Sequence, residues 1–150
     1  MKNLFDQATV TEIKTRLHAL TPASKRSWGT MTVAQMVEHC ARGLELATGD
    51  RVSPRLFIGR AIGWIVKPLA LNDDAPMRRN SPTIPDLKMD SDQSFDVAQT
   101  RLNNLIDRFT SGGRAGCTTH PHSFFGRMTP DEWGILMYKH LDHHLRQFGV

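Results

Sequence analysis

Apolar residues recur every three or four positions along most of the chain, a spacing that is typical of amphipathic α-helices. In the first such segment, Val10, Ile13, Leu17 and Leu20 fall on one face. The same pattern predicts four long helices, over residues 6–20, 32–48, 93–110 and 129–147. Because the periodicity is helical almost everywhere, we expect an all-α fold.

Capping residues mark where two of these helices begin. Thr32 is followed three residues later by Gln35, which is the pattern of a capping box. Thr129 is followed by Pro130, which suits the first helical turn because its missing N–H would have no partner there. The second and fourth helices therefore have well-defined expected starts.

A long connection separates the second predicted helix from the third. Residues 53–68 are expected to hold a short helix, and Pro76, Pro82 and Pro85 prevent the next segment from continuing it. Four amphipathic helices with one long connection describe a four-helix bundle with a crossover. The length of 150 residues fits a single domain over residues 1–150.

The formal net charge of +4 is unevenly distributed. Residues 51–90 hold seven Lys or Arg against four Asp or Glu, whereas residues 91–150 hold six of each. A basic region can steer an anionic ligand or a nucleic acid towards a protein. The alternative is a solvated basic loop without a partner.

No segment predicts export or a membrane span. Asp6 and Glu12 lie where a secretory signal would be apolar, and the stretch "LFIGRAIGWIVKPLAL" is too short and too interrupted to cross a bilayer of roughly 30 Å. Cys40 and Cys117 could form at most one disulfide, so free thiols are expected. We therefore expect a cytoplasmic protein with no membrane partner.

The closing stretch "YKHLDHHLRQFGV" places three histidines on the last helix. At 100° per residue, His140 and His144 fall about 20° on either side of Trp133, in the middle of the apolar stripe, whereas His143 lies about 80° away. A pair at i, i+4 lets two imidazoles converge on one metal ion. The alternative is that histidines near a helix C-terminus interact with the dipole, which suits His143.

The second helix offers a third ligand, His39 in "MTVAQMVEHCARG", although a satisfied, partly buried histidine is the alternative. Gly43, one turn later, would leave room for an ion or a substrate, or would serve helix packing. Gln35, one turn earlier, would orient a ligand or simply cap the helix. Glu38 is rotated by about 100° from His39 and is expected to face solvent.

The loop "HPHSFFG" before the last helix carries His120 and His122. One of them could reach over the end of the bundle as an acid or base, or support a ligand from behind. The alternative is a structural loop that is packed by Phe124 and Phe125.

Three segments, "WGTMTVAQMVEHC", "NSPTIPDL" and "MTPDEWGILMYKHLDHHLRQFG", span residues 28–148 and resemble a domain-of-unknown-function branch of the DinB/YfiT-like superfamily of metal-dependent enzymes. The resemblance implies a four-helix bundle in which one histidine of the second helix and an H-x-x-x-H pair of the fourth hold a metal ion. The matching positions are His39, His140 and His144. Characterised relatives include transferases and isomerases that use low-molecular-weight thiols.

Three neutral imidazoles would leave open positions on a divalent ion, as in catalytic sites. The ion would lower the pKa of bound water to about 7 or deprotonate a bound thiol. We expect zinc on grounds of availability and nickel as the second choice, since imidazole binds both. The leading hypothesis is a metalloenzyme that transfers a thiol to a small-molecule substrate.

Other functions remain open at this point. The same metal centre would serve a hydrolase. The basic region and the lack of an evident general base would suit a non-catalytic module that binds a ligand or, less favourably, nucleic acid. Gln35, His143 and His120 are the candidates for supporting a ligand or contacting substrate, and a homodimer is left open.

Overall fold

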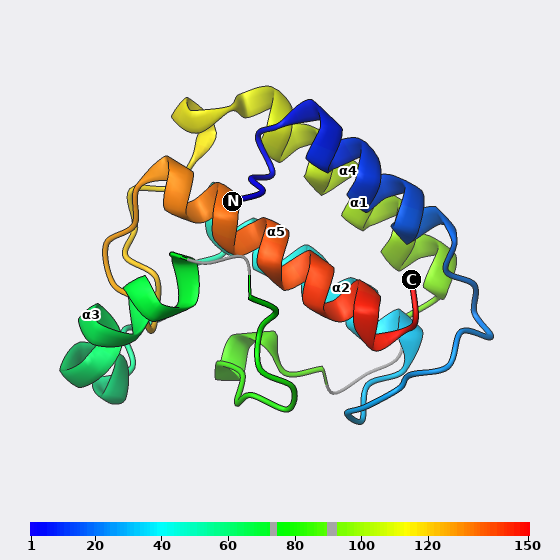
Figure 1. The fold of residues 1–150 in the computed structure, drawn as a ribbon, viewed down its shortest axis with the longest axis horizontal. Helices are drawn as coiled ribbons and strands as arrows, with labels where there is room; N and C mark the ends of the chain where they lie inside the picture. The colour runs from blue at the N-terminus through cyan, green and yellow to red at the C-terminus, as the bar shows by residue number, and fades with distance from the viewer. Residues whose placement is uncertain (73–74, 90–92) are drawn as a thin grey trace.

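The computed structural model describes residues 1–72, 75–89 and 93–150, and all regular secondary structure within these residues is helical (Figure 1). The α-helices are α1 (Gln7–His18), α2 (Val33–Thr48), α3 (Phe57–Leu71), α4 (Phe95–Gly112) and α5 (Pro130–Gln147). Two short 3-10 helices, η1 (Pro85–Leu87) and η2 (Arg114–Gly116), lie in the connections. The predicted all-α class is confirmed.

The predicted helix ends agree closely with the observed ones where capping residues define them. The Thr32 hydroxyl accepts a hydrogen bond from the Gln35 backbone N–H, and the Gln35 side chain accepts one from the Thr32 N–H. Thr129 and Glu132 form the same reciprocal pair at the start of α5. The third helix was expected to follow Asp92, which lies outside the described residues.

Four of the helices enclose the core. Each of α1, α4, α2 and α5 packs against two of the others, in that order around the core, and α2 lies behind α5 in Figure 1. The side chains that fill the space between them are fully buried, and the largest include Trp133, Ile13, Leu44, Ile106 and Leu141. The apolar stripes of the sequence therefore face one another.

Helix α3 lies apart from these four helices (Figure 1). It corresponds to the short helix expected over residues 53–68, but it continues through Pro68 to Leu71. Pro68 has no N–H to donate to the preceding turn, and α3 ends three residues after it. Among the described residues, no helix is both long and apolar enough to cross a membrane.

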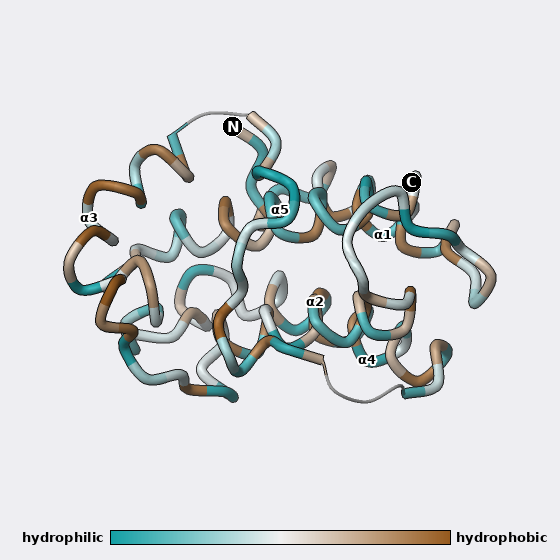
Figure 2. Tube along the Cα trace, turned by 90° about the horizontal axis from the view of Figure 1, so that it is seen from below, coloured by the Kyte–Doolittle hydropathy of each residue, from teal (hydrophilic) through white to brown (hydrophobic). Residues whose placement is uncertain are grey.

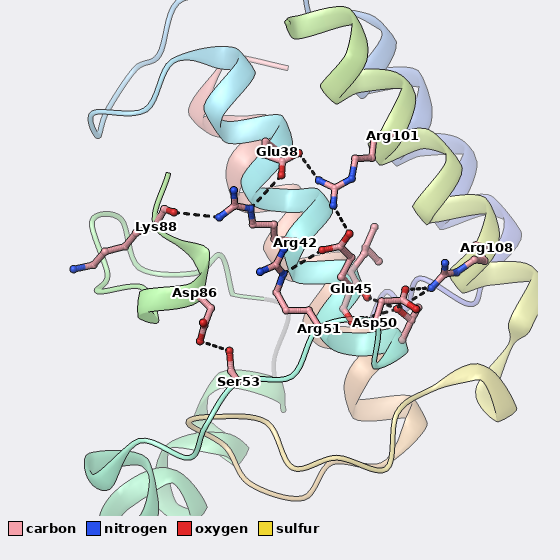
Figure 3. Close-up of polar contacts among 12 residues, drawn as sticks. Glu38, Arg42, Glu45, Asp50, Arg51, Ser53, Asp86, Lys88, Arg101 and Arg108 are labelled. Carbon is pink, nitrogen blue, oxygen red and sulfur yellow. Dashed lines mark hydrogen bonds and ion pairs between the residues drawn. The ribbon is translucent and has the colours of Figure 1, made fainter. Parts of the chain in front are cut away.

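Glu38 is buried, with 3% of its surface exposed, so the expectation that it faces solvent is wrong. Helix α4 packs against this side of α2, and Arg101 of α4 forms an ion pair with the Glu38 carboxylate (Figure 3). Arg42, one turn along α2, holds the other carboxylate oxygen at 3.1 Å. A helical wheel cannot reveal this, because the partner comes from another helix.

The ion pairs continue along α2 as a ladder. Arg101 also contacts Glu45, which in turn pairs with Arg51 at 3.1 Å (Figure 3). Charged groups removed from water are stabilising only when they are paired. The ladder therefore satisfies the buried carboxylates and fixes the position of α4 along α2.

Replacing Glu38 by Ala is expected to lower the free energy of unfolding by about 2 kcal/mol, because two arginines lose a buried carboxylate partner. Urea unfolding measures this change. Glu12→Ala, which removes an exposed carboxylate on α1, is the control and is expected to have a smaller effect. Equal effects of the two substitutions would mean that the ladder does not stabilise the fold.

Candidate metal centre

Three histidines meet between α2 and α5. His39 comes from α2, and His140 and His144 lie one turn apart on α5. Their ring centroids are 4.7 to 4.8 Å apart in all three pairs, and their candidate ligand atoms all lie within 4.8 Å of one another. The structure thus brings together the three residues that the sequence singled out, and this group could hold a metal ion.

Backbone and side-chain carbonyl groups orient two of the rings. His39 Nδ1 lies 2.8 Å from the carbonyl oxygen of Leu87, and His144 Nδ1 lies 2.8 Å from Gln147 Oε1. Since a carbonyl oxygen only accepts hydrogen bonds, both Nδ1 atoms carry the proton. The Nε2 atoms of these two rings are therefore left with the lone pairs that ligate metals.

The third ring faces His39 directly. His140 Nε2 lies 2.8 Å from His39 Nε2, which is the length of an N–H···N hydrogen bond. Because His39 Nε2 presents a lone pair, the His140 Nε2–H is the donor of this bond. Two ligands of one tetrahedral zinc ion lie about 3.3 Å apart, so a small separation of the two rings would let both nitrogens bind one ion.

Gly43 makes this arrangement of rings sterically possible. A Cβ atom at this position would lie 2.9 Å from His140 Nδ1 and 3.0 Å from its Cε1. Gly43 was expected to leave room for an ion or a substrate or to serve helix packing, and the ring of His140 occupies this space.

Burial keeps the three imidazoles neutral. It lowers the pKa of His39 below its usual 6.5, lowers that of His144 to about 3, and lowers that of His140 well below 6.5. The neighbouring imidazoles lower the pKa of His140 further, because nearby positive charges would repel. Neutral imidazole is the form that binds a metal ion.

A cleft of about 540 Å³ opens from these histidines towards the surface. Part of its wall comes from the crossover between α3 and α4, which contributes Met77, Arg78, Asn80, Ser81, Pro82, Thr83, Lys88 and Met89. In the described part of the chain, no Asp or Glu lines it. The charged side chains that line the described part of the cleft, Arg78 and Lys88, are therefore both positive.

Trp28 lies at the wall of the cleft between the crossover and α5. The Arg79 guanidinium lies 4.1 Å from the centre of the Trp28 ring, a cation–π contact. The edge of the same indole meets His143, whose ring centroid is 5.7 Å away. His143 is half-buried, lines the cleft and lies 5.0 Å from the ring of His144.

Gln147 is a residue of this centre that the sequence reasoning missed. Its Oε1 accepts from His144, while its Nε2 donates to the Trp28 carbonyl oxygen at 2.7 Å. The signal in the sequence was its position three residues after His144, one turn further along the same face. Its buried amide joins the loop before α2 to the last turn of α5.

Two predicted supporting residues do not line the cleft. The Gln35 side chain caps α2 through Thr32, as the alternative interpretation proposed. His120 is exposed on its loop, where its Nδ1 lies 3.1 Å from the Pro121 carbonyl oxygen. Neither residue belongs to the described lining of the cleft, so their roles in supporting the metal centre or contacting its substrate stay predictions.

His122 organises the loop before α5. Its Nδ1 accepts hydrogen bonds from the backbone N–H groups of Phe124 and Phe125, both at 3.1 Å. Its ring packs against Phe125 and the edge of Trp133. Burial, together with the positive charge of the nearby Arg55, lowers the pKa of His122 to about 4. These contacts agree with the alternative interpretation, in which the loop is structural and is packed by Phe124 and Phe125.

Comparison with protein families gives a match over nearly the whole chain. The family described as "Protein of unknown function (DUF1569)" matches residues 4–149, which include the three histidines, Gly43 and Gln147. No curated protein and no solved structure matches the chain. The family description names no activity. The chemistry of the centre must therefore be inferred from its side chains.

His122 is expected to stay neutral down to about pH 4 in the folded protein. The unfolded chain takes up this proton near pH 6.5, so the contribution of His122 to stability is complete above that pH and is lost as the pH falls to about 4. Titration of the ring by NMR measures the pKa. In parallel, the difference in unfolding free energy between wild type and His122→Gln should narrow from pH 6.5 to 4, and a titration midpoint near 6.5 would contradict this.

Gly43→Ala is expected to weaken Zn²⁺ binding by about tenfold or more, because the new methyl group displaces the ring of His140. Helix propensity favours Ala by about 1 kcal/mol, so the metal-free protein should stay folded. Calorimetric titration with Zn²⁺ measures the affinity. Gly112→Ala, where an added Cβ meets nothing within 4 Å, is the control. Unchanged Zn²⁺ binding by Gly43→Ala would contradict the arrangement.

Proposed function

This chain belongs to the DUF1569 family, and we propose that it is a metal-dependent enzyme that transfers a low-molecular-weight thiol to an electrophilic small molecule. The observation that carries the proposal is the convergence of three neutral imidazoles at the floor of a cleft. A purely structural centre would be closed by a fourth side chain, whereas this one opens towards solvent.

The ligands of the ion would be His39, His140 and His144. Zinc is the first choice and nickel the second, because imidazole nitrogens bind both. When bound, the ion would act as a Lewis acid and lower the pKa of a thiol or a water molecule that reaches it. The carbonyl oxygens of Leu87 and Gln147 hold two of the rings in the ligand tautomer.

The wall of the cleft supports an anionic cosubstrate. Arg78 and Lys88 of the crossover line it, and no described carboxylate offsets their charge there. Their positive field would raise the local concentration of a thiol that carries a carboxylate. The same residues would hold that carboxylate away from the reacting sulfur. The position of Arg78 and Lys88 at the cleft therefore supports the interpretation that the basic region attracts a small anion, and not the alternative that it is a solvated loop without a partner.

We also propose that the chain is a DinB/YfiT-like four-helix bundle in which α3 is part of the long crossover. The mutual packing of α1, α4, α2 and α5 around one core supports this assignment. So does the origin of the histidines, with one from the second of these helices and an H-x-x-x-H pair from the last.

Metal analysis of the purified protein tests the ligands. His39→Ala, His140→Ala and His144→Ala should each abolish binding of the divalent ion. His143→Ala is the matched control on the same turn of α5, and it should keep the ion with an affinity reduced by at most about tenfold. Full metal occupancy in His140→Ala would show that the ligand set is wrong.

Turnover tests the reaction. The metal-loaded protein should consume an electrophile only when a low-molecular-weight thiol is present, and His140→Ala should lose this activity. Arg78→Gln should raise the KM for an acidic thiol and leave that for a neutral thiol unchanged. Thiol-independent ester cleavage would instead identify a hydrolase, and a metal-loaded protein that is inert to both would identify a binding module.

A further inference from the structure

Helix α3 is rich in hydrophobic residues (Figure 2), and many of its large apolar side chains are exposed. Phe57 is 88% exposed, Leu69 73% and Trp64 71%, and Ile58, Ile62 and Ile65 are exposed on the same helix. Elsewhere in the described residues, large apolar side chains with comparable exposure occur singly, as at Val97 on α4. A contiguous exposed apolar face marks a surface that contacts something else.

The way α3 is attached to the protein determines which face points outwards. A Cβ on Gly59 or Gly63 would lie 2.6 or 2.1 Å from the carbonyl oxygen of Phe124, so these glycines let the loop backbone lie directly on the helix. Small residues at this spacing also allow two helices to pack closely. Because the loop backbone already covers this face of α3, the two glycines are not available for packing against the α3 helix of a second copy of the chain.

The charged residues of α3 and of the segment that leads into it are all positive. Residues 51–72 contain Arg51, Arg55, Arg60 and Lys67 and no Asp or Glu. On a helical wheel Arg60 and Lys67 fall within about 20° of each other, at the border between the glycine face and the apolar face. Arg60 is exposed. Lys67 is joined to Glu132 of α5 at 2.7 Å.

In contrast to the expectation of no membrane partner, we propose that α3 binds the surface of an anionic lipid bilayer, with Phe57, Trp64 and Leu69 inserted at the level of the headgroups and Arg60 against the lipid phosphates. Aromatic and aliphatic residues on one face with cations at its border are typical of helices that lie in the membrane interface. The 15 residues of α3 extend over about 22 Å, less than the hydrocarbon core of roughly 30 Å, so the helix lies on the bilayer and does not span it.

This attachment is compatible with the cleft. The apolar face belongs to α3, whereas the cleft is lined by α2, α5 and the crossover residues that follow α3. None of the α3 residues lines the cleft. The proposal therefore stands independently of the metal centre, and its failure would leave the proposed function untouched.

Co-sedimentation of the full chain with vesicles tests the proposal. The protein should bind phosphatidylcholine vesicles that contain phosphatidylserine, bind pure phosphatidylcholine more weakly, and shift its tryptophan emission to shorter wavelength on binding. Trp64→Gln should reduce partitioning by about tenfold because a buried aromatic side chain is lost. Arg60→Gln should reduce it by about fivefold on the anionic vesicles alone.

Val97→Gln, which replaces a singly exposed apolar residue on α4, is the matched control and should bind like wild type. The α3 substitutions lie on an exposed face, so circular dichroism should be unchanged. Absence of binding to the anionic vesicles, or equal losses for Trp64→Gln and Val97→Gln, would overturn the proposal. A dimer in sedimentation analysis that Trp64→Gln dissociates, without vesicle binding, would assign the face to a second copy.

Discussion

The close approach of α2 and α5 is the constraint on which the metal centre depends. His39 on one helix and His140 on the other bring their Nε2 atoms to 2.8 Å only because Gly43 presents no side chain to the His140 ring. Close-packed interiors leave no slack for an extra methyl group at such a contact. The separation of the α2 and α5 backbones thus sets the geometry of the histidines. The cleft and its positive side chains lie next to these rings.

The crossover contributes more to this centre than its lack of regular structure suggests. The Leu87 carbonyl oxygen holds the ring of His39, Arg78 and Lys88 line the cleft, and Arg79 lies on the Trp28 ring. These contacts hold the crossover in place in addition to its own hydrogen bonds, such as those of η1. One segment therefore both orients a histidine of the candidate metal centre and forms part of the wall of the cleft.

Sequence periodicity identified the helices and the central position of His140 and His144, because apolar spacing along one helix decides which face is buried. It failed for Glu38, whose partner Arg101 lies 63 residues away on α4. It also missed Gln147, since a polar residue on the core side of a helix acquires meaning only through its contacts with other segments. Partners that are distant in sequence leave no periodic signal, so the histidines that converge could be predicted, whereas contacts such as those of Leu87 and Trp28 could not.

The chemistry of those supports favours an anionic ligand in the cleft. Leu87 and Gln147 orient the histidines through uncharged carbonyl oxygens, and the described lining of the cleft contains no carboxylate. A carboxylate in these positions would increase the basicity of the imidazoles and add negative charge beside the centre. With neutral supports and neutral rings, nothing in the described part of the centre opposes the approach of a negatively charged group. Arg78 and Lys88 would attract such a group, so the charges of the wall and the neutral rings of the floor both support the proposed anionic cosubstrate.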